Sequence, residues 1–532
     1  IRDRIKDLRI ADVVGRHDVT GGTVDLSLAA KSLNANGEML IAGVATKLAW
    51  QYILDAPLES QPPVRVQASL DEGDRDKLGI KVNHILRGIV DVDISLIPRT
   101  GGGFGSKVRV DMTKAAIAID SLAWLKPKGR LAQLDFDVVP GKKHPLLLDN
   151  LRVVGDGIAI QGTAMLNEAY DLRAFELPLF SIDRVTRLNL RGKLQRNNVW
   201  QVTVRGQTFE GRSLFRSLFD TGRAARAPKV PRSKQMGVDL EGEITTVLGF
   251  WNSKLSNVRI SISKRQGRMQ KLQFEGRLAG NALFKAAVVR GNGGRRELHA
   301  FSEDAGRAFR LVGFYPNVQN GRLELVVDLD GRGAADKSGV LLVRGFKILG
   351  DEVVGELARA PSSGIRRKRV ARADNGQALA FDWMRLPFFV GNGQFILQGA
   401  ELRGPVVGAT IEGKADFAGR RVDLSGTYVP LQGLNGALGI IPGLGQILAG
   451  PNGEGVLGMK FAVRGPMSQP EMLVNPLSLM APGIFREIFQ ISNPSLEVTK
   501  RSRPPASAAG RTPGSGGAAP RNWRSGVFGG YN

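Results

Sequence analysis

The sequence predicts a mainly β fold built from antiparallel sheet. Apolar and polar residues alternate with period two in many segments, which is typical of strands with one apolar and one solvated face. Glycine is frequent, at 67 of 532 residues, and it often follows such a segment. Aromatic residues make up only 6% of the chain. This composition favours many short strands and turns over a few large helices.

Six segments show the alternation most clearly. In chain order they are 64–70 (VRVQASL), 89–98 (IVDVDISLIP), 133–139 (QLDFDVV), 257–263 (NVRISIS), 321–331 (GRLELVVDLDG) and 458–465 (GMKFAVRG). Three of them supply the apolar-face residues of most interest: Val90, Val92, Ile94, Leu323, Leu325, Val327, Met459, Phe461 and Val463. The pattern is the same whether such a face packs in a closed sandwich core or lines an open surface.

Helical signals are few and short. The segments 121–127 (SLAWLKP) and 211–220 (GRSLFRSLFD) each predict a turn or two of helix. The segment 302–315 (SEDAGRAFRLVGFY) predicts a helix with Ser302 as its N-cap and two acidic residues in its first turn. The acidic segment 71–79 lacks the ligand pattern of a calcium-binding loop and is interpreted as a surface turn.

The C-terminal part contains an uncharged stretch from Leu424 to Gly453. Its many glycines and prolines argue against a transmembrane helix, because they would interrupt the backbone hydrogen bonds that lipid requires. We predict instead two short apolar helices, around 434–441 and 444–449, and a further apolar helical stripe after Pro482. The residues expected to contact a membrane surface are Leu438, Ile441, Leu444, Leu448, Phe485, Ile488 and Phe489.

The net charge and the absence of cysteine and of catalytic motifs limit the classes of function that fit this sequence. A net charge of +24 indicates an anionic partner: nucleic acid, an anionic membrane surface or an acidic molecule. The chain has no cysteine, which excludes disulfides and thiolate chemistry, and its four histidines show no metal-ligand spacing. No catalytic motif is recognisable, so we expect a protein without enzymatic activity, cofactor or metal. Nucleic acid is a less favoured partner, because the basic residues are scattered and no binding motif is present.

Basic segments rich in proline or glycine suggest the domain boundaries. We predict a β-repeat domain over 1–220, a basic linker over 221–237, a second β region over 238–492 and a disordered basic tail over 493–532. The basic segment 358–376 is interpreted as an inserted loop. The chain begins without methionine or an apolar targeting segment, and we expect any such segment to lie upstream.

Residues 235–490 resemble the C-terminal region of the AsmA-like family, in particular its YhdP branch. The resemblance is most specific over 404–489, where GTYVP, LN, IPGLGQIL and NPLSLMAPG occur in that order. Residues 1–215 are similar, by strand pattern, to the uncharacterised domain that precedes this region in the same proteins. The membrane anchor of the family does not occur in this sequence, and the basic loop and tail have no counterpart in it.

The resemblance implies a long, strongly twisted antiparallel β-sheet folded into an elongated hydrophobic groove, with a few short helices at the C-terminal end. It also implies a location in the periplasm of double-membraned bacteria, anchored to the inner membrane by an upstream helix. Members are related to TamB and to bridge-like lipid transfer proteins, and are thought to move phospholipid toward the outer membrane. The apolar-face residues named above would then line the lipid path.

Two other functions remain open at the level of sequence. The protein could assist outer-membrane assembly, together with other envelope proteins, without carrying lipid. It could also be a basic protein that binds a polyanion.

Overall fold

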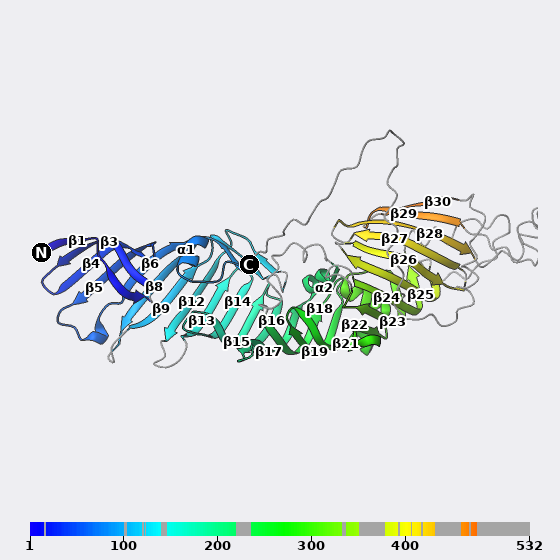
Figure 1. Ribbon diagram of the computed structural model, residues 1–532, viewed down its shortest axis with the longest axis horizontal. Coiled ribbons are helices and arrows are strands. Elements are labelled where there is room, and N and C mark those ends of the chain that lie inside the picture. The colour runs from blue at the N-terminus through cyan, green and yellow to red at the C-terminus, as the bar shows by residue number, and fades with distance from the viewer. Residues whose placement is uncertain are drawn as a thin grey trace, which may run out of the picture.

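The computed structural model describes residues 1–14, 17–99, 104–119, 122, 124–139, 146–219, 236–331, 337–350, 378–391, 394–405, 407–416, 419–430, 459–467 and 470–475. Within these ranges, 27 strands join in one sheet and three more form a second, small sheet. The large sheet extends along the longest axis of the molecule (Figure 1). The prediction of a mainly β fold with a long sheet is confirmed.

The large sheet is a meander in which, from β3 onward, each strand pairs with the next strand of that sheet. β1 (Arg2–Lys6) and β2 (Ile10–Val14) both pair with β3 (His17–Leu28) at the N-terminal edge. The sheet continues through β4 (Ser32–Ile41), β5 (Val44–Ile53), β6 (Val64–Leu70), β8 (Val90–Pro98), β9 (Phe104–Asp111), β12 (Ala132–Val139), β13 (Leu147–Gly155), β14 (Ile158–Leu166), β15 (Leu172–Ile182), β16 (Thr186–Leu194) and β17 (Val199–Glu210). It ends with β18 (Gly237–Leu248), β19 (Lys254–Arg265), β20 (Arg268–Arg277), β21 (Leu283–Arg290), β22 (Arg296–Ser302), β23 (Val318–Asp328), β24 (Lys337–Leu349), β25 (Ala378–Gly391), β26 (Gln394–Arg403), β27 (Val407–Asp416), β28 (Arg421–Pro430), β29 (Met459–Pro466) and β30 (Glu471–Asn475).

One pair of neighbouring strands is parallel. β17 and β18 run in the same direction, with Val199 opposite Gly237 and Glu210 opposite Leu248. These two strands flank the predicted linker 221–237, so the sheet is continuous on both sides of the predicted boundary. The division into domains stays a prediction.

The α-helices and the small sheet are inserted at one edge of the large sheet. α1 (Glu72–Lys77) follows β6, α2 (Arg212–Phe219) follows β17, and α4 (Ala305–Val312) follows β22. The small sheet joins β7 (Leu86–Gly88), β10 (Ala115–Ile119) and β11 (Trp124–Lys126), which lie between β6 and β12 in the chain. Since neighbouring strands alternate in direction, these insertions all fall on the same edge, which we call the covered rim. The opposite edge, the hairpin rim, carries the connections 195–198, 266–267 and 291–295.

Two buried cations hold the insertions at the covered rim. Arg75 of α1 is 1% exposed and donates hydrogen bonds to the carbonyls of Leu70, Leu86 and Gly88 at 2.8–3.1 Å. Lys126 of β11 is 2% exposed, and its ammonium donates to the carbonyls of Met112, Ala115 and Pro127 at 2.8–3.2 Å. Burial lowers the pKa of Lys126. These bonds satisfy donors that would otherwise make burial unfavourable.

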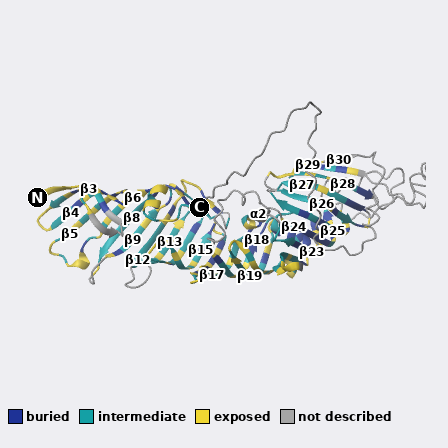
Figure 2. Cartoon of the chain, in the orientation of Figure 1, coloured by how far each residue is buried: buried dark blue, intermediate teal, exposed yellow. Residues whose placement is uncertain are grey.

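The core divides into clusters along the sheet. Residues of the small sheet, including Ala115, Ile117 and Trp124, pack against the covered-rim ends of β6, β8 and β12–β16. Farther along, α4 packs through Phe309 and Leu311 in a cluster that continues to Phe461 and Val463 of β29. Figure 2 shows intermediate burial along most strands and more buried residues around β24 and β25. The core is therefore closed most fully in the C-terminal half of the sheet.

Several local predictions need correction. Residues 124–126 form β11 rather than a helix, because Trp124 and Lys126 are buried in the small sheet. Residues 72–77 form α1 rather than a simple turn, since Asp71 caps the helix by accepting from the Asp74 backbone amide. The N-cap of α4 is Asp304, and the Ser302 hydroxyl instead accepts a hydrogen bond from the Asp304 amide. The helix predicted at 211–220 is confirmed as α2.

The fold predicts an elongated particle in solution. With strands about 4.8 Å apart, the large sheet is on the order of 120 Å across its strands, which gives a radius of gyration of about 35 Å or more. A compact protein of 532 residues would have a radius of gyration near 24 Å. Small-angle X-ray scattering should show the skewed distance distribution of a rod. A symmetric distribution with the compact radius would contradict the fold.

Candidate functional site

The feature that extends over the whole sheet is an apolar face built from transverse rows of paired residues. The first row contains Val24, Gly37, Leu48, Val66, Ile94, Val108 and Phe136, on successive strands from β3 to β12. The second row contains Val92, Val110, Leu134, Val153, Ile160, Phe180, Leu188, Gly206, Ile244 and Val258, from β8 to β19. Paired residues share a face of the sheet, so each row is a continuous apolar strip.

Two further rows continue this face to the C-terminal strands. The central row contains Leu177, Leu190, Val204, Gly242, Ile260, Phe274, Ala286, Ala300, Leu325, Leu341 and Leu386, from β15 to β25. The last row contains Val288, Leu298, Val327, Gly339, Phe388, Leu397, Gly413, Leu424 and Val463, from β21 to β29. Because successive rows overlap on shared strands, the apolar face continues from β3 to β29.

Bulges keep the rows continuous where strict alternation fails. Leu177 and Phe180 are three residues apart, yet they pair with Leu190 and Leu188 on the same face, because a register shift lies between them. Leu397 and Ala400 behave in the same way opposite Gly413 and Ile411, with Gly399 between them at a φ of 64°. Glycine adopts this left-handed conformation without strain.

The apolar face is only partly shielded along much of its length. Val92, Ile94, Val153, Ile160 and Val204 all keep intermediate exposure. A closed sandwich core would bury side chains of this kind almost completely. The opposite face carries exposed charges that alternate in sign across strands, as in the row Arg205, Glu243, Arg259, Glu275 and Lys285.

A hollow of about 900 Å³ lies over β17–β23. Its lining includes seven members of the central row, from Val204 to Leu325, together with residues adjacent to them along each strand. Three of these seven are small: Gly242, Ala286 and Ala300. Small side chains leave space beside the larger Ile260 and Phe274.

The predicted apolar-face residues have different environments. Val92, Ile94, Leu325 and Val327 are half-buried members of the rows, and Val327 and Val463 lie in the same row. Val90 is buried beside the small sheet, and Leu323 is buried in the cluster around α4. Phe461 and Val463 are only 6% and 8% exposed. Met459 begins β29, but its side chain lies outside the described residues.

The predicted membrane-contact residues lie outside the described ranges. This holds for Leu438, Ile441, Leu444, Leu448, Phe485, Ile488 and Phe489, for the short C-terminal helices that would carry them, and for the basic loop 358–376. Among the helices that the structure describes, none is long and apolar enough to cross a membrane. The same part of the chain contains no group of three or more acidic or histidine side chains placed to hold a metal ion.

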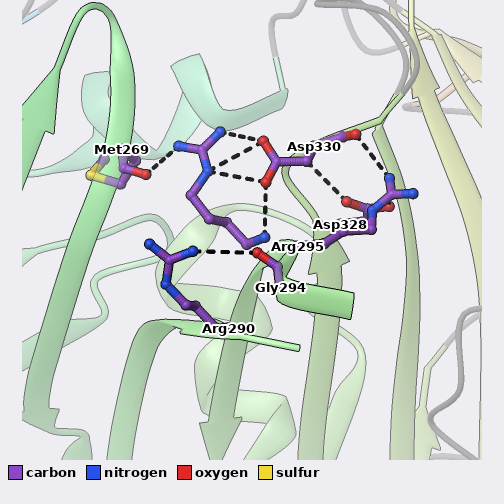
Figure 3. A network of polar contacts seen from close by, with 7 residues as sticks. Met269, Arg290, Gly294, Arg295, Asp328 and Asp330 are labelled. Carbon is purple, nitrogen blue, oxygen red and sulfur yellow. Dashed lines mark hydrogen bonds and ion pairs between the residues drawn. The ribbon is translucent and has the colours of Figure 1, made fainter. Parts of the chain in front are cut away.

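A charged network occupies the hairpin rim beside the hollow. Arg296 donates from its backbone amide and guanidinium to the Asp330 carboxylate, at 2.9 Å and 3.1–3.2 Å. Arg295 pairs with Asp328 and also donates to the Asp330 carbonyl at 2.8 Å. Figure 3 shows these groups together with Arg290, whose guanidinium donates to the Gly294 carbonyl at 3.4 Å. The Arg296 side chain and backbone bonds hold the pKa of Asp330 at about 2.

Sequence analysis missed the small residues of the central row and the hairpin-rim network. Ala300 follows the alternation of Glu297, Leu298 and His299, so the pattern could have placed it on the apolar face, whereas Ala286 lies in the apolar run 286–289, which does not alternate. Nothing in the sequence pairs Arg296 with Asp330, because 34 residues separate them. Their contact depends on β22 and β23 being neighbours.

In comparisons with known proteins, the chain matches no family model, no curated protein and no solved structure. The resemblance to AsmA-like proteins therefore stays an expectation.

Phe461 is buried and Leu325 is half-buried, so a charge introduced at these two positions should lower the stability of the protein by different amounts. Phe461→Glu should destabilise the protein by at least about 3 kcal/mol, because it buries a carboxylate in a closed cluster. Leu325→Glu should cost less than half as much, since its half-buried site lets water reach the charge. Thermal unfolding followed by circular dichroism measures both. Equal losses in the two variants would indicate a closed core at both positions.

The low pKa of Asp330 predicts a specific acid sensitivity. An unfolded aspartate has a pKa of about 3.9, so the Arg296–Asp330 pair stabilises the fold fully above about pH 4 and loses this contribution as pH falls toward about 2. Asp330→Asn should lower the unfolding midpoint at neutral pH and flatten its decline between these values. Asp55→Asn, at an exposed loop carboxylate, is the control and should match wild type. Parallel curves for wild type and Asp330→Asn would refute the role of the pair.

Proposed function

We propose that this protein is a non-enzymatic carrier that moves phospholipid along the apolar face of its sheet, between the inner and outer membranes of a double-membraned bacterium. The observation that carries the proposal is the continuous set of apolar rows from β3 to β29, half-exposed over much of its length and hollowed over β17–β23. Acyl chains are the ligands that match such a surface, since they need apolar contact without hydrogen bonds.

The length of the apolar face favours a protein that moves lipid along its surface over one that holds a single ligand in a pocket. A site for one small ligand would need a single enclosed pocket lined by a few placed polar groups. Here the rows continue across strand after strand with apolar side chains, so that a chain moved over the half-exposed positions exchanges one apolar contact for a similar one. In β24, β25 and β29 the row residues Leu341, Phe388 and Val463 are buried, so the low-cost part of the path is the half-exposed part of the sheet.

Charge supports a phospholipid as the cargo. The net charge of +24 favours ligands that combine acyl chains with an anionic group. The charges on the opposite face alternate in sign and pair across strands, which suits a solvated outer surface. A periplasmic location and an upstream inner-membrane anchor complete the proposal, on the resemblance to AsmA-like proteins.

The lipid content of the purified protein tests the proposal. Mass spectrometry of lipids that co-purify with the full chain should find stoichiometric phospholipid. A protein free of lipid that still corrects an envelope defect would instead favour an assembly factor, and salt-sensitive binding of nucleic acid would favour a polyanion-binding protein.

Plugging the hollow gives a sharper test. Ala286→Phe and Ala300→Phe add large side chains to the central row, and each should reduce transfer of fluorescent phospholipid between vesicles several-fold. Both sites are partly exposed, so the fold should tolerate the change. Val289→Phe is the control, because residue 289 lies on the same strand, faces the other way and is not among the residues that line the hollow. Full transfer by the plugged variants, or equal loss in the control, would refute a lipid path over the central row.

A further inference from the structure

The two rims beside the hollow differ in chemistry. At the covered rim, α2 and α4 close the ends of the strands: Leu255, Leu311 and Val318 are buried there, and the Phe250 amide donates to the Leu311 carbonyl at 3.1 Å. A methyl group added at Gly249 would lie 2.4 Å from the Leu311 carbonyl oxygen. The strand ends around Gly249 are therefore tightly packed, and the charged residues of this edge, such as Arg212 and Lys254, are exposed outside that contact.

The hairpin rim is open and basic. Basic residues cluster at the strand ends of this edge: Lys193, Arg196, Lys264, Arg265, Arg268, Arg290, Arg295, Arg296 and Lys337. Fewer acids accompany them, and these are already engaged: Asp239 with Arg265, Glu297 with His299, Asp328 with Arg295 and Asp330 with Arg296. The rim therefore carries excess positive charge.

Arg268 and Arg290 are the arginines best placed to bind an anion. Both are exposed, and within the part of the chain that the structure describes neither lies within ion-pair distance of a carboxylate, although the charge of Arg268 contributes to lowering the pKa of Asp330. Arg290 adjoins a loop in which Gly293 and Gly294 have positive φ and open space around them. Guanidinium groups bind phosphate oxygens through paired hydrogen bonds, so this edge suits a phosphate group.

The distance from this edge to the floor of the hollow fits a lipid. Arg290 lies four residues from Ala286 on β21, and Arg268 lies six residues from Phe274 on β20. At about 3.3 Å per residue these separations are roughly 13 and 20 Å. One leaflet of a bilayer contributes about half of the ~30 Å hydrocarbon core, or roughly 15 Å. A tail directed from the hairpin rim would thus reach the central row.

We infer that the phosphate of a carried phospholipid binds at the hairpin rim, at Arg268 and Arg290, while its acyl chains lie on the central row. This inference rests on the proposed function and adds to it the orientation of the lipid and a preference for headgroups that bear phosphate. The opposite orientation is disfavoured, because α2 and α4 pack over the strand ends at the covered rim. The Arg295–Asp328 and Arg296–Asp330 pairs hold the hairpins in place, and the unpaired arginines contact the ligand.

The experiment compares two fluorescent lipids with the same acyl chains, phosphatidylglycerol and diacylglycerol, bound to the full-length protein. Arg268→Gln combined with Arg290→Gln should weaken phosphatidylglycerol binding about tenfold and leave diacylglycerol binding unchanged. Arg152→Gln combined with Arg187→Gln removes the same charge from exposed positions on β13 and β16, and should change neither. Inorganic phosphate, added as a competitor, should displace little phosphatidylglycerol.

The outcomes separate the inference from the proposed function. If wild type binds both lipids and the Arg268/Arg290 variant binds phosphatidylglycerol as well as wild type does, the apolar path stands and the headgroup site is wrong. An equal loss in the Arg152/Arg187 variant would show a general charge effect and also overturn the site. Efficient displacement by inorganic phosphate would identify a free-anion site instead. If wild type binds neither lipid, the proposed function fails and the inference fails with it.

Discussion

Strand register is the constraint on which the rest of the structure depends. Side chains alternate between the faces of a strand, so a slip of one residue at any pairing would move every following apolar side chain to the solvated face. The rows continue from β3 to β29 because bulges absorb the irregularities, as between Leu177 and Phe180. The parallel pairing of β17 and β18 preserves the face as well, with Val204 opposite Gly242 and Gly206 opposite Ile244.

The second property of the sheet is its asymmetry. The helices and the small sheet enter at the covered rim, where Arg75 and Lys126 use backbone carbonyls to satisfy their buried charges. The hairpin rim keeps short connections and charged side chains. An apolar face between a closed edge and a basic, hydrated edge defines a direction across the sheet, which suits a ligand with one apolar and one anionic end.

Burial also changes along the sheet. Half-exposed positions such as Val92 and Val204 give way to buried ones such as Phe461 in the C-terminal strands. The α4 cluster explains part of this change, because Phe309 and Leu311 join the same core as Leu323 and Val343. The two interpretations of the alternation, an open face and a closed core, thus both apply to this molecule, each to different strands.

Period-two alternation by itself determined the mainly β fold and the face on which Val92, Leu325 and Val463 lie, because alternation is a local property of a strand. Local chemistry also indicated α2. Tertiary structure alone decided which strands are neighbours, where bulges correct the register and which half-buried positions adjoin the hollow. The Arg296–Asp330 ion pair and the burial of Phe461 likewise depend on which strands are neighbours in the sheet. These features arise from contacts between residues far apart in the chain, and a local pattern of residues carries no information about such contacts.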